Sequence, residues 1–305
     1  MTTAQPFPLH RDADGEFAGI ITIKLEQPGK PVVVLDLELI QRLEATLRSI
    51  PRDCRGVVLA SASERVFVAG ADLKTIAEAS DDQLHRYLEY GSRVFAMLSS
   101  LHCPTVAAIN GAALGGGLEL AMHCDAMVAA PPPARDGQPG KPYPVGLPEA
   151  GLGLCPGWGG TNLLPAWMDD AAEAIRRTVT GKPMLWDEAA KAGLFDAVAA
   201  SSGELMQTAA RVAGALASGR SGTRSSAVDI WAADPAGAKR TLQALEAVRA
   251  DQTVSDAALA VYDAINVGLT QGYQAALACE RRHLVALRHT PAAKAALQAF
   301  FARSK

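Results

Sequence analysis

The chain has 305 residues, of which 49% are hydrophobic and 20% charged, and its formal net charge is −3. This length allows one large domain, or one domain with a smaller second one, around a sizeable core. The basic residues are scattered and are not interleaved with aromatic ones, which excludes a nucleic-acid-binding stripe. Every long apolar run is interrupted by Gly, Asn or Glu, so we expect no membrane span.

The cysteines and histidines indicate no disulfide framework and no metal site. Five cysteines, an odd number, form no CxxC pair, which is typical of reduced thiols in a cytoplasmic protein. The six histidines show no spacing typical of zinc ligands, so we expect no metal. The first residues lack the charged-then-apolar pattern of a signal peptide.

The first half of the chain alternates between strand and helix patterns. Residues 18–25 alternate as in a strand, and residues 36–50 place apolar side chains at helical spacing after Asp36, which is suited to cap a helix. The order is that of an α/β fold. Further elements expected in this half are strands at 56–62 and 65–70, a helix after Asp72, a helix over 81–101 and a strand at 105–109.

Residues 110–125, NGAALGGGLELAMHCD, carry three consecutive glycines at positions 115 to 117. Glycine lets another molecule approach the backbone closely. The apolar run that follows, residues 118–130, has good helix propensity. The pattern predicts a turn that opens a helix, with free amides beside the carboxylate of Glu119. Such amides next to a carboxylate are typical of acyl-group chemistry with proton transfer, and tight packing with Glu119 at the surface is the alternative.

The second half of the chain is mostly helical. Residues 131–144 are rich in proline and are expected to form an irregular surface loop before Glu149. A turn over residues 156–161 opens a helix, and residues 194–198 read as a short strand. Residues 218–226 have the composition of a flexible linker, and helical spacing continues from there to the end.

Two amide-rich turns and two carboxylates, Glu119 and Glu149, lie at junctions where α/β folds place their sites. The segments around them resemble the crotonase family, the enoyl-CoA hydratase/isomerase superfamily. Their order and spacing agree with the family over about residues 18–200. The four segments are VAGADLK (68–74), AAINGAALGGGLELAMHCD (107–125), GLPEAGLGLCPGWGGT (146–161) and TGKPMLWDEAAKAGLFDAV (180–198).

The resemblance implies an α/β fold with a ββα spiral core over residues 1–200 and a C-terminal helical region over 201–305. Residues 262–301 are similar to the helical segment that follows the hydratase part of multifunctional fatty-acid oxidation proteins. The expectation is a free-standing hydratase unit that retains this tail. The loop at 131–144 is longer than the family's usual connection and could narrow the acyl pocket.

The resemblance also implies roles for individual residues. It places the oxyanion hole on the backbone N–H groups of Ala71 and Gly116, and the acid/base pair on Glu119 and Glu149. The implied reaction adds water to a trans-2-enoyl-CoA to give a 3-hydroxyacyl-CoA, with coenzyme A as part of the substrate and no further cofactor. The substrate-binding residues implied by the same segments are Ala69, Gly70, Asp72, Leu73, Lys74, Gly115, Gly117, Pro148 and Gly157.

Two other functions remain open at this point. A Δ3-Δ2-enoyl-CoA isomerase needs only one base, and a non-catalytic acyl-CoA-binding or partner-docking subunit needs neither glutamate. The resemblance implies a homotrimer or hexamer, whereas the retained tail allows a monomer. A 3-hydroxyacyl-CoA dehydrogenase is a candidate partner, and neither nucleic acid nor a membrane is expected.

Overall fold

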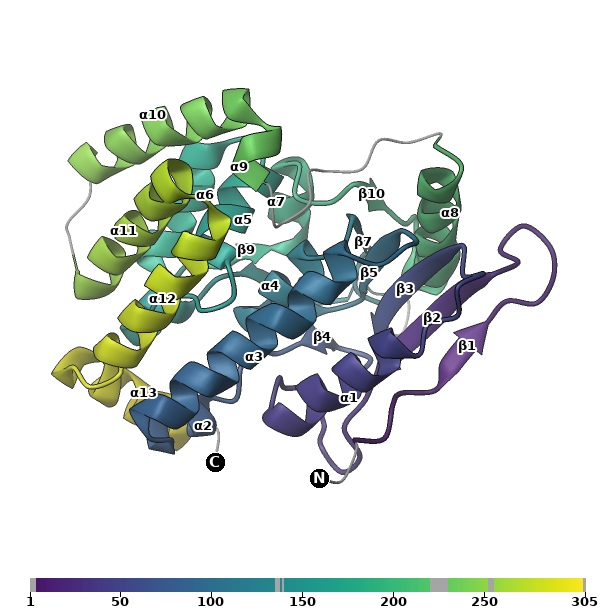
Figure 1. Ribbon diagram of the computed structural model, residues 1–305, viewed down its shortest axis with the longest axis horizontal. Helices are drawn as coiled ribbons and strands as arrows, with labels where there is room; N and C mark the ends of the chain where they lie inside the picture. The colour runs from purple at the N-terminus through teal and green to yellow at the C-terminus, as the bar shows by residue number, and fades with distance from the viewer. Residues whose placement is uncertain (1–3, 135–137, 139, 220–229, 252–254, 304–305) are drawn as a thin grey trace.

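The computed structural model describes residues 4–134, 138, 140–219, 230–251 and 255–303 (Figure 1). In these residues the strands form two sheets. The larger sheet has the order β1 (Leu9–Arg11), β2 (Ile20–Leu25), β3 (Gly56–Ser61), β5 (Thr105–Ile109), β7 (Ala126–Ala129) and β10 (Ala197–Val198). Its neighbours run parallel except for the edge strand β1. The smaller sheet has the order β4 (Val66–Val68), β6 (Ala112–Leu114), β8 (Pro144–Gly146) and β9 (Met184–Leu185).

The chain passes from the larger sheet to the smaller one in three successive units. Strand β3 is followed by β4 and by helices α2 (Leu73–Glu78) and α3 (Asp81–Ser99). Strand β5 is followed by β6 and α4 (Gly116–Met122), and β7 by β8, the 3-10 helix η1 (Glu149–Leu152) and α5 (Gly160–Trp167). Each unit therefore contributes one strand to each sheet and then a helix, which is a ββα spiral. The predicted α/β fold class is confirmed.

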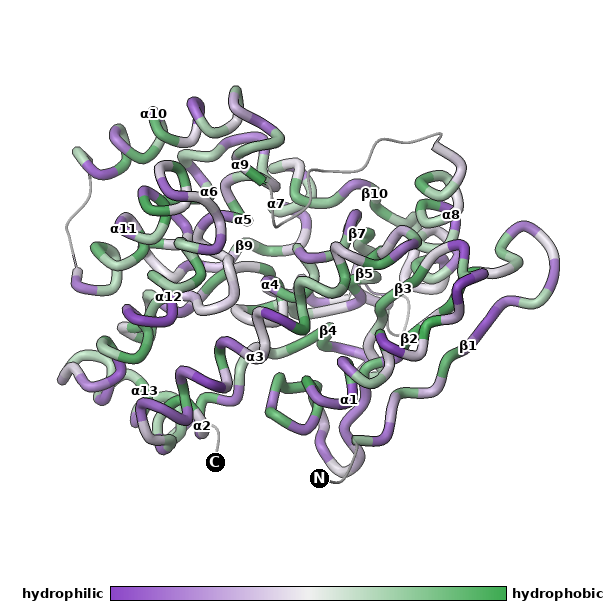
Figure 2. The backbone as a smooth tube through the Cα atoms, viewed as in Figure 1, coloured by the Kyte–Doolittle hydropathy of each residue, from purple (hydrophilic) through white to green (hydrophobic). Residues whose placement is uncertain are grey.

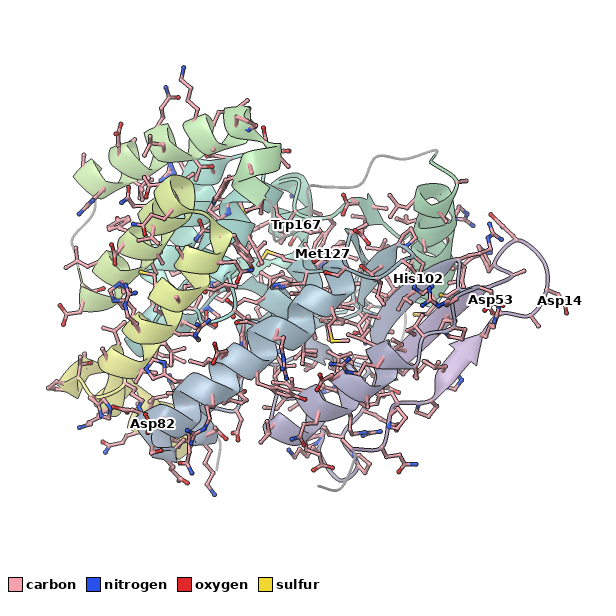
Figure 3. The ribbon with its side chains drawn as sticks, in the orientation of Figure 1. Asp14, Asp53, Asp82, His102, Met127 and Trp167 are labelled. Atoms are coloured by element: carbon pink, nitrogen blue, oxygen red, sulfur yellow. The ribbon has the colours of Figure 1, made fainter. Side chains whose placement is uncertain are left out.

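The larger sheet is buried on both faces. Successive side chains of a strand point to opposite faces, so neighbouring residues of one strand belong to two different hydrophobic clusters. Val57 and Leu59 of β3 belong to the main core, which also takes in α1 (Leu37–Arg48) and α3. Val58 and Ala60 belong to a second cluster beneath α8 (Leu205–Ala217), which lies along the sheet in Figure 1. Figure 3 shows Met127 of β7 in the interior of the molecule, where it is fully buried.

The C-terminal region is helical and packs on the core. Helices α11 (Asp256–Gln271) and α12 (Tyr273–Leu287) lie against each other, α12 also packs on α3, and α13 (Pro291–Arg303) contacts α2 and η1. In Figure 2 hydrophilic and hydrophobic residues alternate along the outer helix α10, as expected for a helix with one covered face. None of the described helices combines the length and apolar character that a membrane crossing requires. The remaining elements are α6 (Ala171–Thr180), α7 (Trp186–Lys191), η2 (Ser202–Glu204), α9 (Ile230–Ala233) and α10 (Pro235–Asp251).

Several local predictions are confirmed. The Asp36 carboxylate accepts a hydrogen bond of 2.8 Å from the amide of Leu39 at the start of α1, and Asp72 caps α2 in the same way. The five cysteines are free and buried. The division between a core over residues 1–200 and a region over 201–305 stays a prediction; α8, which follows residue 200, packs on the larger sheet.

The predicted turn at the glycines does open a helix, but the helix propensity of residues 118–130 does not carry it to the end of that run. Helix α4 ends at Met122, and the next element, β7, lies between β5 and β10 in the larger sheet. Alanine and methionine favour helices, but the packing of a central strand on both faces overrides that preference. The short strand β6 before the glycines was also missed. Residues 135–137 and 139 of the expected loop and 220–226 of the expected linker lie outside the described residues.

Candidate active site

The predicted site segments follow three neighbouring strands of the smaller sheet. Strand β6 pairs in parallel with β4 on one side and with β8 on the other. The carboxyl ends of parallel strands meet at one edge of a sheet. The segments that follow them, residues 69–71, 115–117 and 148–149, therefore lie together. A Cβ added to Gly70 would lie 3.0 Å from the Leu114 carbonyl oxygen, and one added to Gly115 would lie 2.3 Å from Oε1 of Glu149.

These segments enclose a cavity of about 530 Å³. Gly117 does not line it, because its α carbon faces Val68, where a Cβ would lie 2.3 Å from the carbonyl oxygen. All other predicted site residues do line it: Ala69, Gly70, Ala71, Asp72, Leu73, Lys74, Gly115, Gly116, Glu119, Pro148, Glu149 and Gly157.

Two backbone amides border the cavity without a protein acceptor. Gly116 is the first residue of α4, so its N–H has no acceptor within the helix. Ala71 follows β4 and precedes the cap of α2. Within the described part of the chain neither N–H donates a hydrogen bond to another residue. Two such donors could together receive an oxygen that gains negative charge.

Glu119 projects from the first turn of α4 and is 1% exposed. Its Oε1 accepts hydrogen bonds from the amides of Trp158, at 2.8 Å, and Gly160, at 2.7 Å. Burial raises the pKa of this carboxyl well above its usual range, the negative charges of Glu280 and Glu149 raise it further, and the two amides oppose the rise. Both amides bind the same oxygen, Oε1.

Glu149 begins η1, directly after β8 and Pro148. Its Oε2 is buried and has no hydrogen-bond partner among the described residues. Burial raises the pKa of Glu149 to about 8, and the negative charge of Glu280 adds to the rise. A carboxyl with this pKa holds its proton at neutral pH. The cavity thus contains two different carboxyl groups: Glu119, which has two amide donors, and Glu149, whose buried Oε2 has none among the described residues.

Trp158 forms the wall between α3 and α4. Its indole N–H donates to the Leu88 carbonyl at 2.9 Å, and the ring covers Gly116, where a Cβ would lie 2.3 Å from Cζ3. Behind Glu119, His123 contacts the Glu119 carbonyl oxygen at 2.7 Å through Nδ1. Burial lowers the pKa of His123 to about 4, so this ring is neutral.

Sequence reasoning missed most of the apolar lining and one buried carboxylate, Glu280. The latter comes from α12 and is described below. The apolar lining residues carry no signal of their own in the sequence, because they read as ordinary buried positions of helices and strands. They include Val32, Val34, Ile76, Leu88, Leu114, Leu152, Leu154, Trp158, Leu284, Phe300 and Phe301.

Among the described residues one group could offer three metal ligands. Asp263 of α11 and Cys279 and His283 of α12 bring their ligand atoms within 4.8 Å of one another, outside the cavity. Asp263 Oδ2 accepts a hydrogen bond of 3.2 Å from the Cys279 thiol and lies 2.7 Å from His283 Nε2. Hydrogen bonding alone accounts for this arrangement.

The chain is similar in sequence to known proteins over most of its length. A family model described as Enoyl-CoA hydratase/isomerase matches residues 15–257. A fatty acid oxidation complex subunit alpha from Shewanella amazonensis is 32% identical over 98% of this chain, and one from Shewanella loihica is 34% identical over 94%. The chain spans 41% and 40% of those two relatives.

Solved structures share the fold. An enoyl-CoA hydratase from Bacillus anthracis is 28% identical, with a TM-score of 0.60 over 98% of this chain and 97% of the other. The human mitochondrial delta3-delta2-enoyl-CoA isomerase has a TM-score of 0.67 over 98% of both chains, and its 24% identity shows a common fold only.

Proposed function

Because the chain belongs to the enoyl-CoA hydratase/isomerase family, we propose that it is an enoyl-CoA hydratase, which adds water to a trans-2-enoyl thioester of coenzyme A. The observation that carries this proposal is that two carboxylates and two free amides line one cavity. Hydration needs a base for the water, an acid for C2 and donors for the thioester oxygen, and the cavity offers a group for each.

The amides of Ala71 and Gly116 bind the thioester carbonyl oxygen. When the water oxygen attacks C3, electron density moves from the double bond onto this oxygen and gives an enolate. Fixed donors bind the enolate more strongly than the ground-state carbonyl, and one such donor is typically worth about 3 kcal/mol in the transition state. Gly116 has no room for a side chain here, since Trp158 covers its α carbon.

Glu119 and Glu149 hold the water and move its protons. In the reactive state Glu119 is the ionised partner, because two amides stabilise the charge on its Oε1 against the rise in pKa that burial causes, and it accepts a proton from water as the C3–O bond forms. Glu149, whose buried Oε2 has no donor, is the protonated partner and gives its proton to C2. The product gains O–H at C3 and H at C2. The proton left on Glu119 passes to Glu149 through the solvent before the next turnover.

The test follows the absorbance of the conjugated thioester, which is lost on hydration. We expect crotonyl-CoA turnover by the wild-type protein, and a fall of about 100-fold or more in kcat for Glu119→Gln and for Glu149→Gln. Glu64→Gln, which changes an exposed carboxylate, is the matched control and should retain wild-type activity. Full turnover by either site variant rejects the proposed roles.

The two alternatives give different results in the same experiment. An isomerase converts 3-hexenoyl-CoA and depends on only one of the two glutamates. A non-catalytic subunit turns over no enoyl-CoA and co-purifies with a partner. The names of the curated relatives support a place in fatty-acid oxidation, and a 3-hydroxyacyl-CoA dehydrogenase is the partner that would consume the product. A homotrimer or hexamer and a monomer remain alternative predictions for the assembly.

A further inference from the structure

Two glutamates share the start of one helix beside the cavity. The amides of Trp158 and Gly160 donate to Oε1 of Glu119. The amides that alternate with them, those of Gly159 and Thr161, donate to Glu280 at 2.6 and 3.0 Å. Four consecutive amides at the beginning of α5 are thus divided between two carboxylates that come from different helices. The first N–H groups of a helix lack internal acceptors, and a carboxylate is a favourable partner for them.

The side chain of Glu280 accepts three hydrogen bonds, whereas that of Glu119 accepts two. Glu280 is fully buried, and its Oε1 also accepts a hydrogen bond of 2.5 Å from the Thr161 hydroxyl. That hydroxyl accepts from the side chain of Asn162, which in turn accepts from the indole N–H of Trp231 at 2.8 Å. The network joins α12, α5 and α9. Glu280 does not line the cavity, so it cannot touch the substrate directly.

Few charged or titratable groups surround Glu119 and can influence its ionisation. Helix α5 carries no charged residue, and His123 is neutral because burial lowers its pKa to about 4. Burial raises the pKa of Glu280 to about 7, against three hydrogen bonds and the positive charge of Arg281. The other titratable groups packed around the two carboxyls are Glu149 of η1, Tyr87 of α3, Tyr273 and Cys279 of α12, and Cys155.

We propose that Glu280 of the C-terminal region is a positioning residue for Glu119. It acts through the start of α5, whose amides donate to both carboxylates. By holding the amides of Gly159 and Thr161, it fixes the two peptide units on either side of the one whose N–H, that of Gly160, donates to Oε1 of Glu119. Its negative charge also strengthens Glu119 as a base, since a nearby like charge favours the protonated form. This inference rests on the proposed function only in naming Glu119 as the base.

The main variant is Glu280→Gln, which keeps the size of the side chain and removes its charge. We expect kcat to fall about 10- to 100-fold, by analogy with the loss of side chains that orient metal ligands, with little change in KM. The acid limb of the kcat/KM profile, which reports the base, should move to lower pH, because the negative charge of Glu280 raises the pKa of Glu119. A purely structural role would lower activity without moving this limb.

Two further variants separate charge from packing. Glu280→Asp keeps the charge, so the acid limb should stay near its wild-type position even where activity falls. Thr161→Val removes the hydroxyl donor that lowers the pKa of Glu280 and leaves both amides that hold Glu119. It should therefore weaken the charge of Glu280 and move the limb in the same direction as Glu280→Gln, but less far. A limb that stays in place in Glu280→Gln, or moves equally in all three variants, overturns the proposal.

A measurement on the wild-type protein keeps the test independent of variant folding and of enzyme activity. Amide resonances of Trp158 and Gly160 report the titration of Glu119, and those of Gly159 and Thr161 report that of Glu280. If the charges interact, each pair shows two steps with shared midpoints. Independent single steps contradict the proposal. Absence of crotonyl-CoA turnover by the wild type would reject the proposed function and leave this result standing.

Discussion

Replacing Glu149 by glutamine should stabilise the protein, and the gain should grow with pH. Burial raises the pKa of this carboxyl from its ordinary 4.5 to about 8. The folded state therefore holds the proton over a pH range in which the unfolded chain has released it. Wild-type stability falls as pH rises from about 4.5 and levels off above about 8, where both states are ionised. The glutamine side chain does not titrate and does not share this loss.

The size of the effect follows from the same pKa. One pKa unit corresponds to about 1.4 kcal/mol, so the full penalty for the ionised group is about 5 kcal/mol. About 4 kcal/mol of it develops between pH 5 and pH 9. At about 2.1 cal/mol/K of unfolding entropy per residue, this difference corresponds to about 6 °C in Tm for a chain of this length.

The assay is thermal unfolding of the wild type and of Glu149→Gln across this pH range. Glu119 and Glu280 remain in both proteins, so the difference between the two curves reports Glu149 together with the effect of its charge on the pKa of Glu119. Glu64→Gln, at an exposed position, should show a difference from the wild type that does not depend on pH. A Tm difference for Glu149→Gln that stays constant with pH, or that shrinks as pH rises, refutes the reasoning.

Three further changes test other parts of the site. Gly116→Ala should lower kcat/KM by about 100-fold, because the new Cβ meets Trp158 and displaces the amide; Gly214→Ala, with open space around it, is the control. Phe301→Ala should raise kcat/KM for decenoyl-CoA relative to crotonyl-CoA by enlarging the cavity, and an unchanged ratio would contradict this. Arg288→Met should cost about 1 to 2 kcal/mol in chemical denaturation, because the buried guanidinium donates a hydrogen bond to the Ile76 carbonyl oxygen, which would lose its donor; an unchanged unfolding midpoint would contradict it.

Local chemistry explains which elements could be predicted from the sequence. The helix after Asp36 was predictable because its cap and its apolar spacing lie within a dozen residues, and the structure keeps both. Strand β7 was not predictable in this way. Its sequence, AMVA, favours a helix, and only its place between β5 and β10 makes it a strand.

The candidate site likewise contains residues that could be found from the sequence and one that could not. Glu119 and Glu149 stand in distinctive segments after glycine or proline, so a resemblance could single them out. Glu280 stands in the run CERRHL, where a glutamate beside two arginines is typical of a solvated helix face. Its burial depends on α12 folding back onto a turn more than a hundred residues earlier in the chain, which no local pattern encodes.

The C-terminal region therefore has a larger part in the site than its sequence indicates. Helix α12 supplies Glu280 to the start of α5, places the Tyr273 hydroxyl against Gly159 and adds Leu284 to the cavity wall, while α13 adds Phe300 and Phe301. These contacts come from the same chain that carries Glu119 and Glu149. Since buried carboxylates are costly and the α5 amides offset part of that cost, the geometry of the proposed acid/base pair depends on how α12 packs. Substitutions that loosen α12 should thus affect proton transfer before they affect the fold of the two sheets.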